Sequence, residues 1–322
     1  MKYIQGRDNL SATIHVQTDC KQNCNFCINK SYYKNLSVAN FAYLQNFQLL
    51  VNSNIKEFVI TGGEPLENIV ELRALLDNLE SKIVYINTTL PVDTFNDFLQ
   101  VCKEYDNIKG VNISRHGYSF DDEQLKNVVV DEDIKLIPIK TRINVVIDVD
   151  TNIEKVIKRW SGMDVEVNLR YDFTKVTKEK LNTPDKKHMI ELINLGFVVN
   201  GVSSCNVCHT THFSDGGTAV SLHRGLELTS SSIRSSNFFE NISNALNDLE
   251  RIEVNDFILM PDGKLCYDWD GKEVDVESFR ESFYKYVEYY GDNGCNSLNL
   301  PLRQSSSNYC GKFCNAGRGR RC

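Results

Sequence analysis

The stretch from Glu57 to Asn87, EFVITGGEPLENIVELRALLDNLESKIVYIN, predicts a strand, a helix and a second strand. The apolar run Glu57–Ile60 ends at Thr61-Gly62-Gly63, as a buried strand that enters a loop does. The next segment, Glu67–Leu79, carries apolar side chains at helical spacing, at Ile69, Leu72, Leu75, Leu76 and Leu79. Lys82–Asn87 is again an apolar, strand-like run. A strand, helix and strand of this length predict two parallel strands joined by a crossover helix.

The same alternation extends on both sides of this unit. Further strands are expected at Ala12–Gln17, Gly110–Ser114, Thr141–Asp148 and Asp164–Tyr171. Further helices are expected at Ser37–Val51, Asp93–Cys102, Asp121–Asn127 and Ile153–Trp160. Six strands that alternate with helices predict a parallel α/β sheet. Periodicity alone does not decide between an open doubly wound sheet and part of a β/α barrel.

The second part of the chain has a different composition. A helix at Asp185–Leu195 and a strand at Phe197–Val202 are followed by a segment rich in Gly and Ser. We therefore predict a core at 1–200 and a second, cysteine-rich domain at 201–322. Within the latter we expect a hairpin that turns at Pro261-Asp262-Gly263, between helices at Asn241–Glu250 and Val276–Tyr290.

Composition excludes several classes of protein. The 322 residues are 41% hydrophobic and 25% charged, which is average globular usage. No apolar run approaches the roughly 18 residues of a membrane span. The N-terminus lacks the apolar segment of a secretory signal, so we expect a cytoplasmic protein. The net charge of −7, from 36 Lys+Arg and 43 Asp+Glu, argues against broad nucleic-acid binding.

Cysteine usage is unusual, with 11 in a chain that shows no export signal. Clustered cysteines in a reducing compartment are better interpreted as metal ligands than as disulfides. Cys102 stands alone in an apolar helix and is expected to be a core residue. Cys20, Cys24 and Cys27 lie within eight residues, in CKQNCNFC, directly after a predicted strand. Thiolates select zinc or iron–sulfur clusters, and three ligands on a four-iron cluster leave one iron open, as in catalytic sites.

This triad, with Phe26 before its third cysteine, resembles the signature of the radical S-adenosylmethionine (radical SAM) superfamily. Gly62-Gly63-Glu64-Pro65 resembles the glycine motif of the same superfamily, in the expected order. The resemblance covers roughly residues 11–202 and implies a partial (β/α)6 barrel of parallel strands, with a smaller cysteine-rich α+β domain at the C-terminus. It also implies a [4Fe-4S] cluster held by the triad, S-adenosylmethionine (SAM) on the open iron, and a flavodoxin- or ferredoxin-like electron donor. A structural zinc loop, and a mere turn at the glycines, are the alternatives.

The resemblance further implies which residues bind SAM. Phe26 would flank the adenine, and Gly62 and Gly63 would let the backbone approach SAM closely. Glu64 and Pro65 would fix that loop and help to hold the amino group. Ser114 would contact the ribose. Arg142 and Asn144 resemble the Arg-x-Asn of several members, and the guanidinium of Arg142 suits the SAM carboxylate. The alternatives are a turn serine and an ordinary surface arginine.

The later cysteines are Cys205, Cys208, Cys266, Cys295, Cys310, Cys314 and Cys322. Cys205-Asn206-Val207-Cys208-His209 matches the c-type haem pattern, which we reject because haem attachment follows export. The region resembles the SPASM and twitch extensions that carry an auxiliary [4Fe-4S] cluster, although the spacing departs from those patterns and ligand sets cannot be assigned. Zinc, with His209 or His212, and unligated thiols remain open. The tail arginines, Arg318, Arg320 and Arg321, are either a basic end or ligands for phosphate or carboxylate.

The resemblance thus implies a radical SAM enzyme that works at low oxygen, cleaves SAM reductively to a 5′-deoxyadenosyl radical and abstracts a hydrogen atom. The first strand begins near Ser11, which leaves no room for a preceding leader-peptide-binding domain, so we expect a small molecule, a nucleotide or a free-standing peptide as substrate. Methyl or methylthio transfer is a second possibility. A non-enzymatic, zinc-stapled binding module is the third.

Overall fold

The computed structural model describes residues 2–5, 10–22, 24, 26–27, 29–33, 41–116, 126–148, 150–172, 186–205, 208–225, 251–254, 256–267 and 271–284. The chain divides into two units, Met1–Phe283 and Tyr284–Cys322, and every helix and strand described below belongs to the first. Within these described ranges, no helix is both long enough and apolar enough to cross a membrane.

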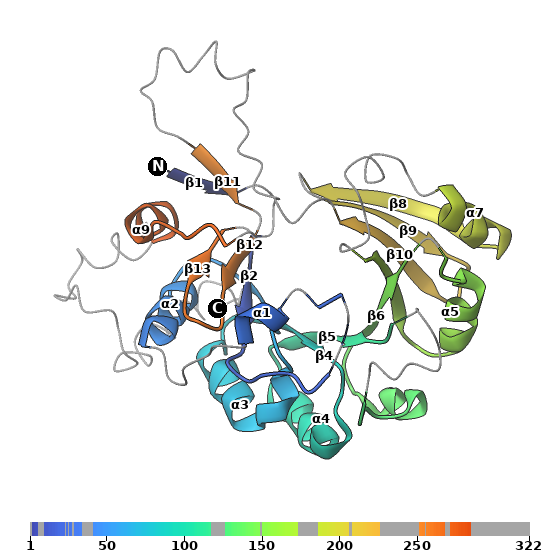
Figure 1. Cartoon of the computed structure of the whole chain (residues 1–322), viewed down its shortest axis with the longest axis horizontal. Helices are drawn as coiled ribbons and strands as arrows, with labels where there is room; N and C mark the ends of the chain where they lie inside the picture. The colour runs from blue at the N-terminus through green and yellow to red at the C-terminus, as the bar shows by residue number, and fades with distance from the viewer. Residues whose placement is uncertain are drawn as a thin grey trace, which may run out of the picture. The chain divides into compact units, whose positions relative to one another are not determined.

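One sheet of eleven strands dominates the unit (Figure 1). Its central six strands are parallel and follow the chain order: β2 (Ser11–His15), β3 (Glu57–Thr61), β4 (Ile83–Thr88), β5 (Ile108–Ser114), β6 (Thr141–Ile147) and β7 (Glu166–Tyr171). This arrangement confirms the predicted parallel α/β architecture of six sequential strands. Six strands in unbroken chain order are typical of a partial (β/α)6 barrel, whereas a doubly wound sheet reverses its order. The barrel that the resemblance implies is therefore confirmed, although periodicity could not distinguish the two.

Helices connect these strands. They are α1 (Lys30–Tyr33), α2 (Phe41–Val51), α3 (Ile69–Asn78), α4 (Phe95–Glu104) and α5 (Ile153–Trp160), with 3-10 turns at η1 (Pro65–Asn68), η2 (Val92–Thr94) and η3 (Asp131–Leu136). Most of the predicted helices are thus present. The helix expected at Asp121–Asn127 lies largely outside the described residues, and η3 was not predicted.

Additional strands extend both edges of the parallel core. On one side β12 (Asp256–Leu259) pairs in parallel with β2, and β13 (Leu265–Cys266) pairs with β12 as the predicted hairpin. On the other side β10 (Ala219–Gly225) pairs in parallel with β7, and β9 (Cys208–Ser214) and β8 (Val198–Cys205) follow as antiparallel strands. Strands from both sides of residue 200 share this sheet; the division into domains at 1–200 and 201–322 stays a prediction.

The remaining elements are α7 (Lys186–Asn194), α9 (Val276–Phe283) and a two-stranded sheet of β1 (Lys2–Gln5) and β11 (Arg251–Val254). The predicted helices at Asp185–Leu195 and Val276–Tyr290 are confirmed over α7 and α9. β1, β9, β10 and β11 were not predicted, because a short strand or one rich in polar residues gives little periodic signal. The helix expected at Asn241–Glu250 lies outside the described residues.

The two faces of the parallel sheet differ in character. Along β3 and β4, Phe58, Ile60, Val84 and Ile86 are fully buried and alternate with half-buried residues. Buried leucines of α3 supply the matching apolar surface, and Figure 1 shows α3 and α4 beside these strands. Each buried side chain of this size contributes about 1.5–3 kcal/mol. The opposite face carries Thr61, Asn87, Asn112 and other polar groups, so it is the face that can receive a ligand.

Candidate metal centre

The cysteine loop, residues 16–29, leaves the end of β2 and carries Cys20, Cys24 and Cys27. None of the three is in a disulfide; Cys24 is buried, and the other two are half-buried. Burial raises the pKa of Cys20 to about 12, and the nearby thiols of Cys24 and Cys27 add to this rise. The three thiols are thus close enough to interact electrostatically, and a bound cation would reverse the shift by stabilising the thiolates.

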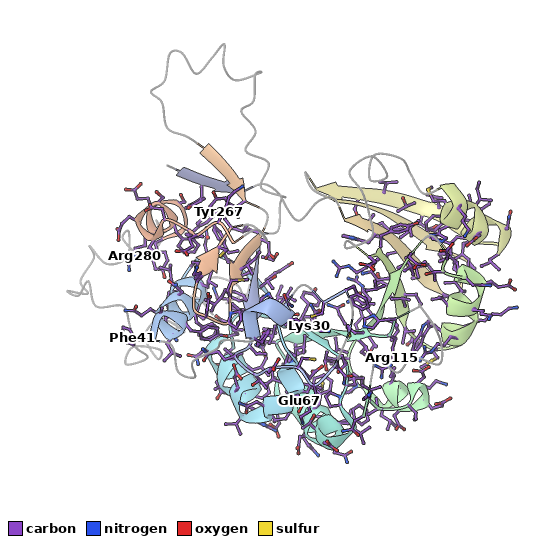
Figure 2. The ribbon with its side chains drawn as sticks, viewed as in Figure 1. Lys30, Phe41, Glu67, Arg115, Tyr267 and Arg280 are labelled. Atoms are coloured by element: carbon purple, nitrogen blue, oxygen red, sulfur yellow. The ribbon has the colours of Figure 1, made fainter. Side chains whose placement is uncertain are left out.

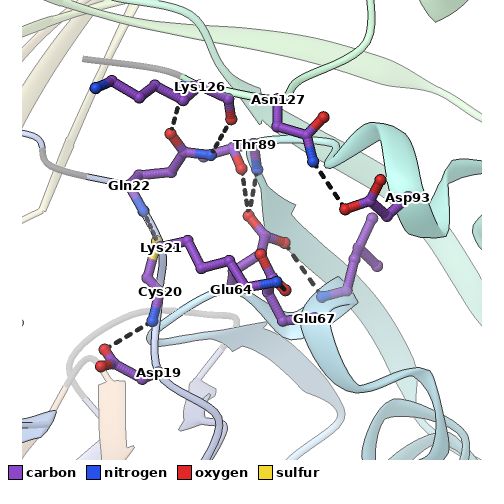
Figure 3. Close-up of polar contacts among 11 residues, drawn as sticks. Asp19, Cys20, Lys21, Gln22, Glu64, Glu67, Thr89, Asp93, Lys126 and Asn127 are labelled. Carbon is purple, nitrogen blue, oxygen red and sulfur yellow. Dashed lines mark hydrogen bonds and ion pairs between the residues drawn. The ribbon is translucent and has the colours of Figure 1, made fainter. Parts of the chain in front are cut away.

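Both sides of this loop are tied to neighbouring elements (Figure 3). The ammonium of Lys21 pairs with Glu67 of η1 at 2.5 Å. The amide of Gln22 donates to the carbonyl oxygen of Lys126 at 2.8 Å and accepts from its N–H at 2.7 Å. Glu71 of α3 accepts from the backbone N–H of Gln17 at 2.8 Å. These contacts fix residues 17–22 of the loop on η1, α3 and Lys126.

The glycine loop, Gly62 to Pro65, lies directly against the cysteine loop. Gly62 follows β3 with φ of +120°, and a Cβ there would lie 2.9 Å from the backbone nitrogen of Val16. A Cβ on Gly63 would lie 2.8 Å from the carbonyl carbon of Asp19 and still closer to the carbonyl oxygen of Thr18. Real Cβ atoms essentially never approach so closely. Both glycines are therefore required by the contact between the two loops, whatever ligand they also approach.

Glu64 is buried, and both of its oxygens are engaged. Oε1 accepts from the hydroxyl of Thr88 at 2.5 Å and from the N–H of Leu66 at 3.1 Å. Oε2 accepts from the N–H and the hydroxyl of Thr89, at 2.7 and 2.6 Å. Burial raises the pKa of Glu64, and these four hydrogen bonds oppose the rise. Its side chain thus joins the ends of β3 and β4 (Figure 3), and the buried Pro65 begins η1 beside it.

Arg115 and His116 follow Ser114, the last residue of β5 (Figure 2 labels Arg115). The buried guanidinium of Arg115 donates to the carbonyl oxygens of Thr89 and Val129, at 2.7 and 3.0 Å. The Nε2 atom of His116 lies 3.6 Å from the Sγ of Cys24. Burial, and then the charge of Arg115, lower the pKa of His116 to about 4, so its ring is neutral. The ring also packs edge-on against Phe26, with centroids 4.4 Å apart.

The other predicted SAM-binding residues lie on β5 and β6. Ser114 stands directly opposite Asn144 in the register of these strands. The side-chain oxygen of Asn144 accepts from Asn168 on β7 at 2.8 Å. Arg142, two residues earlier, forms a 3.0 Å ion pair with Glu166. Burial would raise the pKa of Glu166, but the charges of Arg142 and Lys140 hold it below its ordinary value.

The cysteines of the second half are only partly described. The backbones of Cys205 and Cys208 stand opposite each other and close the β8–β9 hairpin. Cys266, at the end of β13, is buried beside Ile258 and Met260. Cys295, Cys310, Cys314 and Cys322 lie outside the described residues, as do the tail arginines. Cys102 is buried on α4, as expected of a core residue.

Three thiols on one loop are the donor set of an iron–sulfur cluster. In the described part of the chain, no three Cys, His, Asp or Glu side chains are grouped around a point that could hold a single metal ion. A four-iron cluster places one cysteine on each of several irons, so its ligands surround a larger body. Thiolates are ligands of iron–sulfur clusters, so the donor chemistry of the triad fits the predicted cluster.

A family model described as a 4Fe-4S single cluster domain matches residues 8–108. The matched region, called the cluster domain below, is similar to such a domain over about a third of the chain. The match confirms the resemblance to the radical SAM superfamily for this part of the chain, because the cluster domain includes both the cysteine triad and the glycine loop. No curated protein matches the chain.

Several solved structures are similar to the chain. SuiB of Streptococcus suis bound to S-adenosylmethionine is 14% identical, with a TM-score of 0.48, over 80% of this chain and 59% of SuiB. SuiB bound to its precursor peptide SuiA is 15% identical, with a TM-score of 0.49, over 80% and 58%. The native anSMEcpe structure with bound AdoMet and the Cp18Cys peptide is 15% identical, with a TM-score of 0.47, over 85% and 80%. The chain thus spans about three fifths of the length of SuiB, and the ligands named are those of the other proteins.

Three residues of the cluster domain and its surroundings were not singled out from the sequence. Tyr33 contacts the glycine loop, Thr89 anchors Glu64, and His116 contacts Cys24. Thr89 follows β4 directly and Arg115-His116 follow β5 directly, at the edge of the sheet where parallel α/β folds bind ligands. That position is the signal that could have identified them.

Proposed function

We propose that this chain is a radical SAM enzyme whose Cys20, Cys24 and Cys27 hold a [4Fe-4S] cluster. The observation that carries the proposal is the direct packing of the Gly62–Gly63 loop on the backbone of the cysteine loop, inside the matched cluster domain. When bound, the cluster supplies the electron for reductive cleavage of SAM, which starts hydrogen-atom abstraction from the substrate.

The chain's own residues would bind and orient SAM. The triad would hold three of the irons of a four-iron cluster, and the remaining iron would be open to the amino and carboxylate groups of SAM. Ser114, the last residue of β5, stands opposite Asn144 in the middle of β6, which supports the use of both residues at one SAM site. Arg142 would release its ion pair with Glu166 and pair with the carboxylate of SAM instead. Phe26 would flank the adenine, from a ring already fixed against His116.

The main role that we propose for Glu64 is to hold the glycine loop in place. Its described hydrogen bonds are with Thr88, Thr89 and Leu66, and they hold the glycine loop on β4. Pro65, as the first residue of η1, fixes the direction in which the chain leaves that loop. A contact between Glu64 and the amino group of SAM stays a prediction.

We also propose an auxiliary cluster that includes Cys205 and Cys208. Their backbones form the closing pair of a hairpin, which supports joint use of the two residues as ligands. Cys266, Cys295, Cys310, Cys314 and Cys322 are the candidates for the remaining positions. The proposed substrate is a small molecule, a nucleotide or a peptide. The proposed location is the cytoplasm, and the proposed electron donor is a flavodoxin- or ferredoxin-like protein.

The test is anaerobic reconstitution with iron and sulfide, followed by reaction with SAM and dithionite. The wild type should form 5′-deoxyadenosine. Cys102→Ala is the matched control, because it removes a buried thiol outside the cysteine loop, and it should also form 5′-deoxyadenosine. Replacement of Cys20, Cys24 and Cys27 by Ala should abolish it. Formation at the wild-type rate in the triple variant would refute the proposal, and zinc as the only bound metal in anaerobically purified protein would favour the binding module. Methylated products would identify the transferase alternative.

A further inference from the structure

His116 reaches the cysteine triad from outside its loop. Its Nε2 atom lies 3.6 Å from the Sγ of Cys24, across 92 residues of sequence. Both side chains are buried, so water does not compete for this contact. A sulfur atom at this distance can accept a hydrogen bond from a ring N–H.

The position of the imidazole is fixed on several sides. The N–H of the preceding Arg115 donates to the carbonyl oxygen of Asn144 at 2.9 Å, which continues the β5–β6 pairing to the residue before His116. The guanidinium of Arg115 is anchored on the carbonyl oxygens of Thr89 and Val129. Phe26, one residue before Cys27, packs edge-on against the ring at an interplanar angle of 77°. The ring is therefore placed by the protein scaffold and not by the thiol alone.

We propose that the Nε2–H of His116 donates a hydrogen bond to the thiolate of Cys24 and thereby raises the reduction potential of the cluster. This inference rests on the proposed function, because it requires a cluster on the triad. His116 is a positioning residue in this sense: it acts on the cluster through Cys24 and needs no contact with SAM or substrate.

The physical reason is electrostatic. Reduction adds one negative charge to the cluster, and part of that charge resides on the ligand sulfurs. A donor aimed at a sulfur therefore stabilises the reduced form more than the oxidised form, and hydrogen bonds to sulfur are among the factors that set cluster potentials. Because the site is buried, solvent screens this effect little.

The test compares reduction potentials by redox titration, monitored by electron paramagnetic resonance, in reconstituted full-length protein without SAM. His116→Phe keeps a ring against Phe26 but removes the donor. His116→Gln keeps an N–H that can reach the sulfur. His188→Phe is the control, since His188 on α7 makes its hydrogen bond with Tyr171.

In His116→Phe the one-electron reduction equilibrium should shift about fivefold toward the oxidised form, or about 40 mV at 59 mV per tenfold. His116→Gln should recover most of the shift, and the control should titrate like the wild type. If His116→Phe holds four irons and titrates within twofold of the wild type, the donor role is wrong. If the phenylalanine variant loses the cluster, His116→Ala replaces it with the same expectation. Loss of the cluster in the Phe, Ala and Gln variants alike would show a packing role instead and overturn the inference.

Failure of this inference is distinguishable from failure of the proposed function. If the wild type binds a cluster and cleaves SAM, but the reduction potential is the same in the His116 variants, only the inference is overturned. A wild-type protein without a cluster on the triad would overturn the proposed function, whatever the variants show.

Discussion

The backbone N–H of Gly63 donates a 2.5 Å hydrogen bond to the hydroxyl oxygen of Tyr33. The same hydroxyl donates to the carbonyl oxygen of Val16 at 2.9 Å. Tyr33 ends α1, the helix after the cysteine loop, while Val16 begins that loop. One buried phenol therefore joins both ends of the cysteine loop to the glycine loop. Burial raises the pKa of Tyr33, so the hydroxyl keeps the proton that it donates.

Tyr33→Phe should weaken this junction. The N–H of Gly63 and the carbonyl of Val16 lose their partner, at a cost of about 1–3 kcal/mol. We expect a lower midpoint of thermal unfolding and faster loss of iron to a chelator. Tyr105→Phe removes an exposed hydrogen bond to Asp77 and should change both within error. Equal iron retention in the two variants would contradict the role of Tyr33.

Gly63→Ala should impair cluster binding as well as SAM binding. Its new methyl group meets the backbone of Thr18 and Asp19, immediately before Cys20, so the cysteine loop must move. Iron per chain and SAM affinity by equilibrium dialysis are the measurements. Gly201→Ala is the matched control, because nothing lies within 4 Å of its new methyl group. A variant that lost SAM binding but kept the full cluster would show that only the ligand needs this glycine.

Glu64→Gln should destabilise the protein, with a deficit that depends on pH. An amide NH2 would face donors from Thr88 or Thr89, which costs about 1–3 kcal/mol. Because burial raises the folded pKa of Glu64, the wild-type carboxyl contributes stability that is present below its unfolded pKa of about 4.3 and is lost as pH rises through the folded value. The deficit in the free energy of unfolding should therefore be smaller at pH 8 than at pH 5. A larger deficit at pH 8 would mean that the four hydrogen bonds outweigh burial.

The triad variant should retain iron if the second-half cysteines bind an auxiliary cluster. We expect roughly 8 Fe in the wild type and about 4 Fe in the triple variant, since thiolates prefer such clusters. Further replacement of Cys205 and Cys208 by Ser should remove most of that remainder. If the reconstituted triple variant holds neither iron nor zinc, the auxiliary site is absent and the proposal for the cluster domain still stands.

The parallel core could be predicted because each of its strands and helices has a clear periodic signal of its own. Glu57–Asn87 is an example: β3, α3 and β4 lie within two residues of their predicted positions. The triad and the glycine motif could be found because their residue types are set by chemistry. The location of both at strand ends then followed from the fold class.

The contacts that complete the site could not be predicted in the same way. His116 and Cys24 are 92 residues apart, and nothing in their local sequence states that β5 ends beside the cysteine loop. For Glu64 the motif predicted a contact with a ligand, whereas its carboxylate accepts hydrogen bonds from Thr88 and Thr89 in the structure. Tertiary neighbours decide such roles, and single-sequence periodicity carries no information about them.

The parallel pairing of β12 with β2 bears on how the protein is made. The hydroxyls of Ser11 and Thr13 donate to the carboxylate of Asp256, at 3.0 and 2.7 Å, across more than 240 residues. Contacts of such high sequence separation form late, since a long loop must close before they can form. During synthesis at about 5–20 residues per second, β2 therefore waits at least ten seconds for its second neighbour. The strand that precedes the cysteine loop therefore gains its second neighbour only after most of the chain has been synthesised, so this edge of the sheet is expected to reach its final form late in translation or after it.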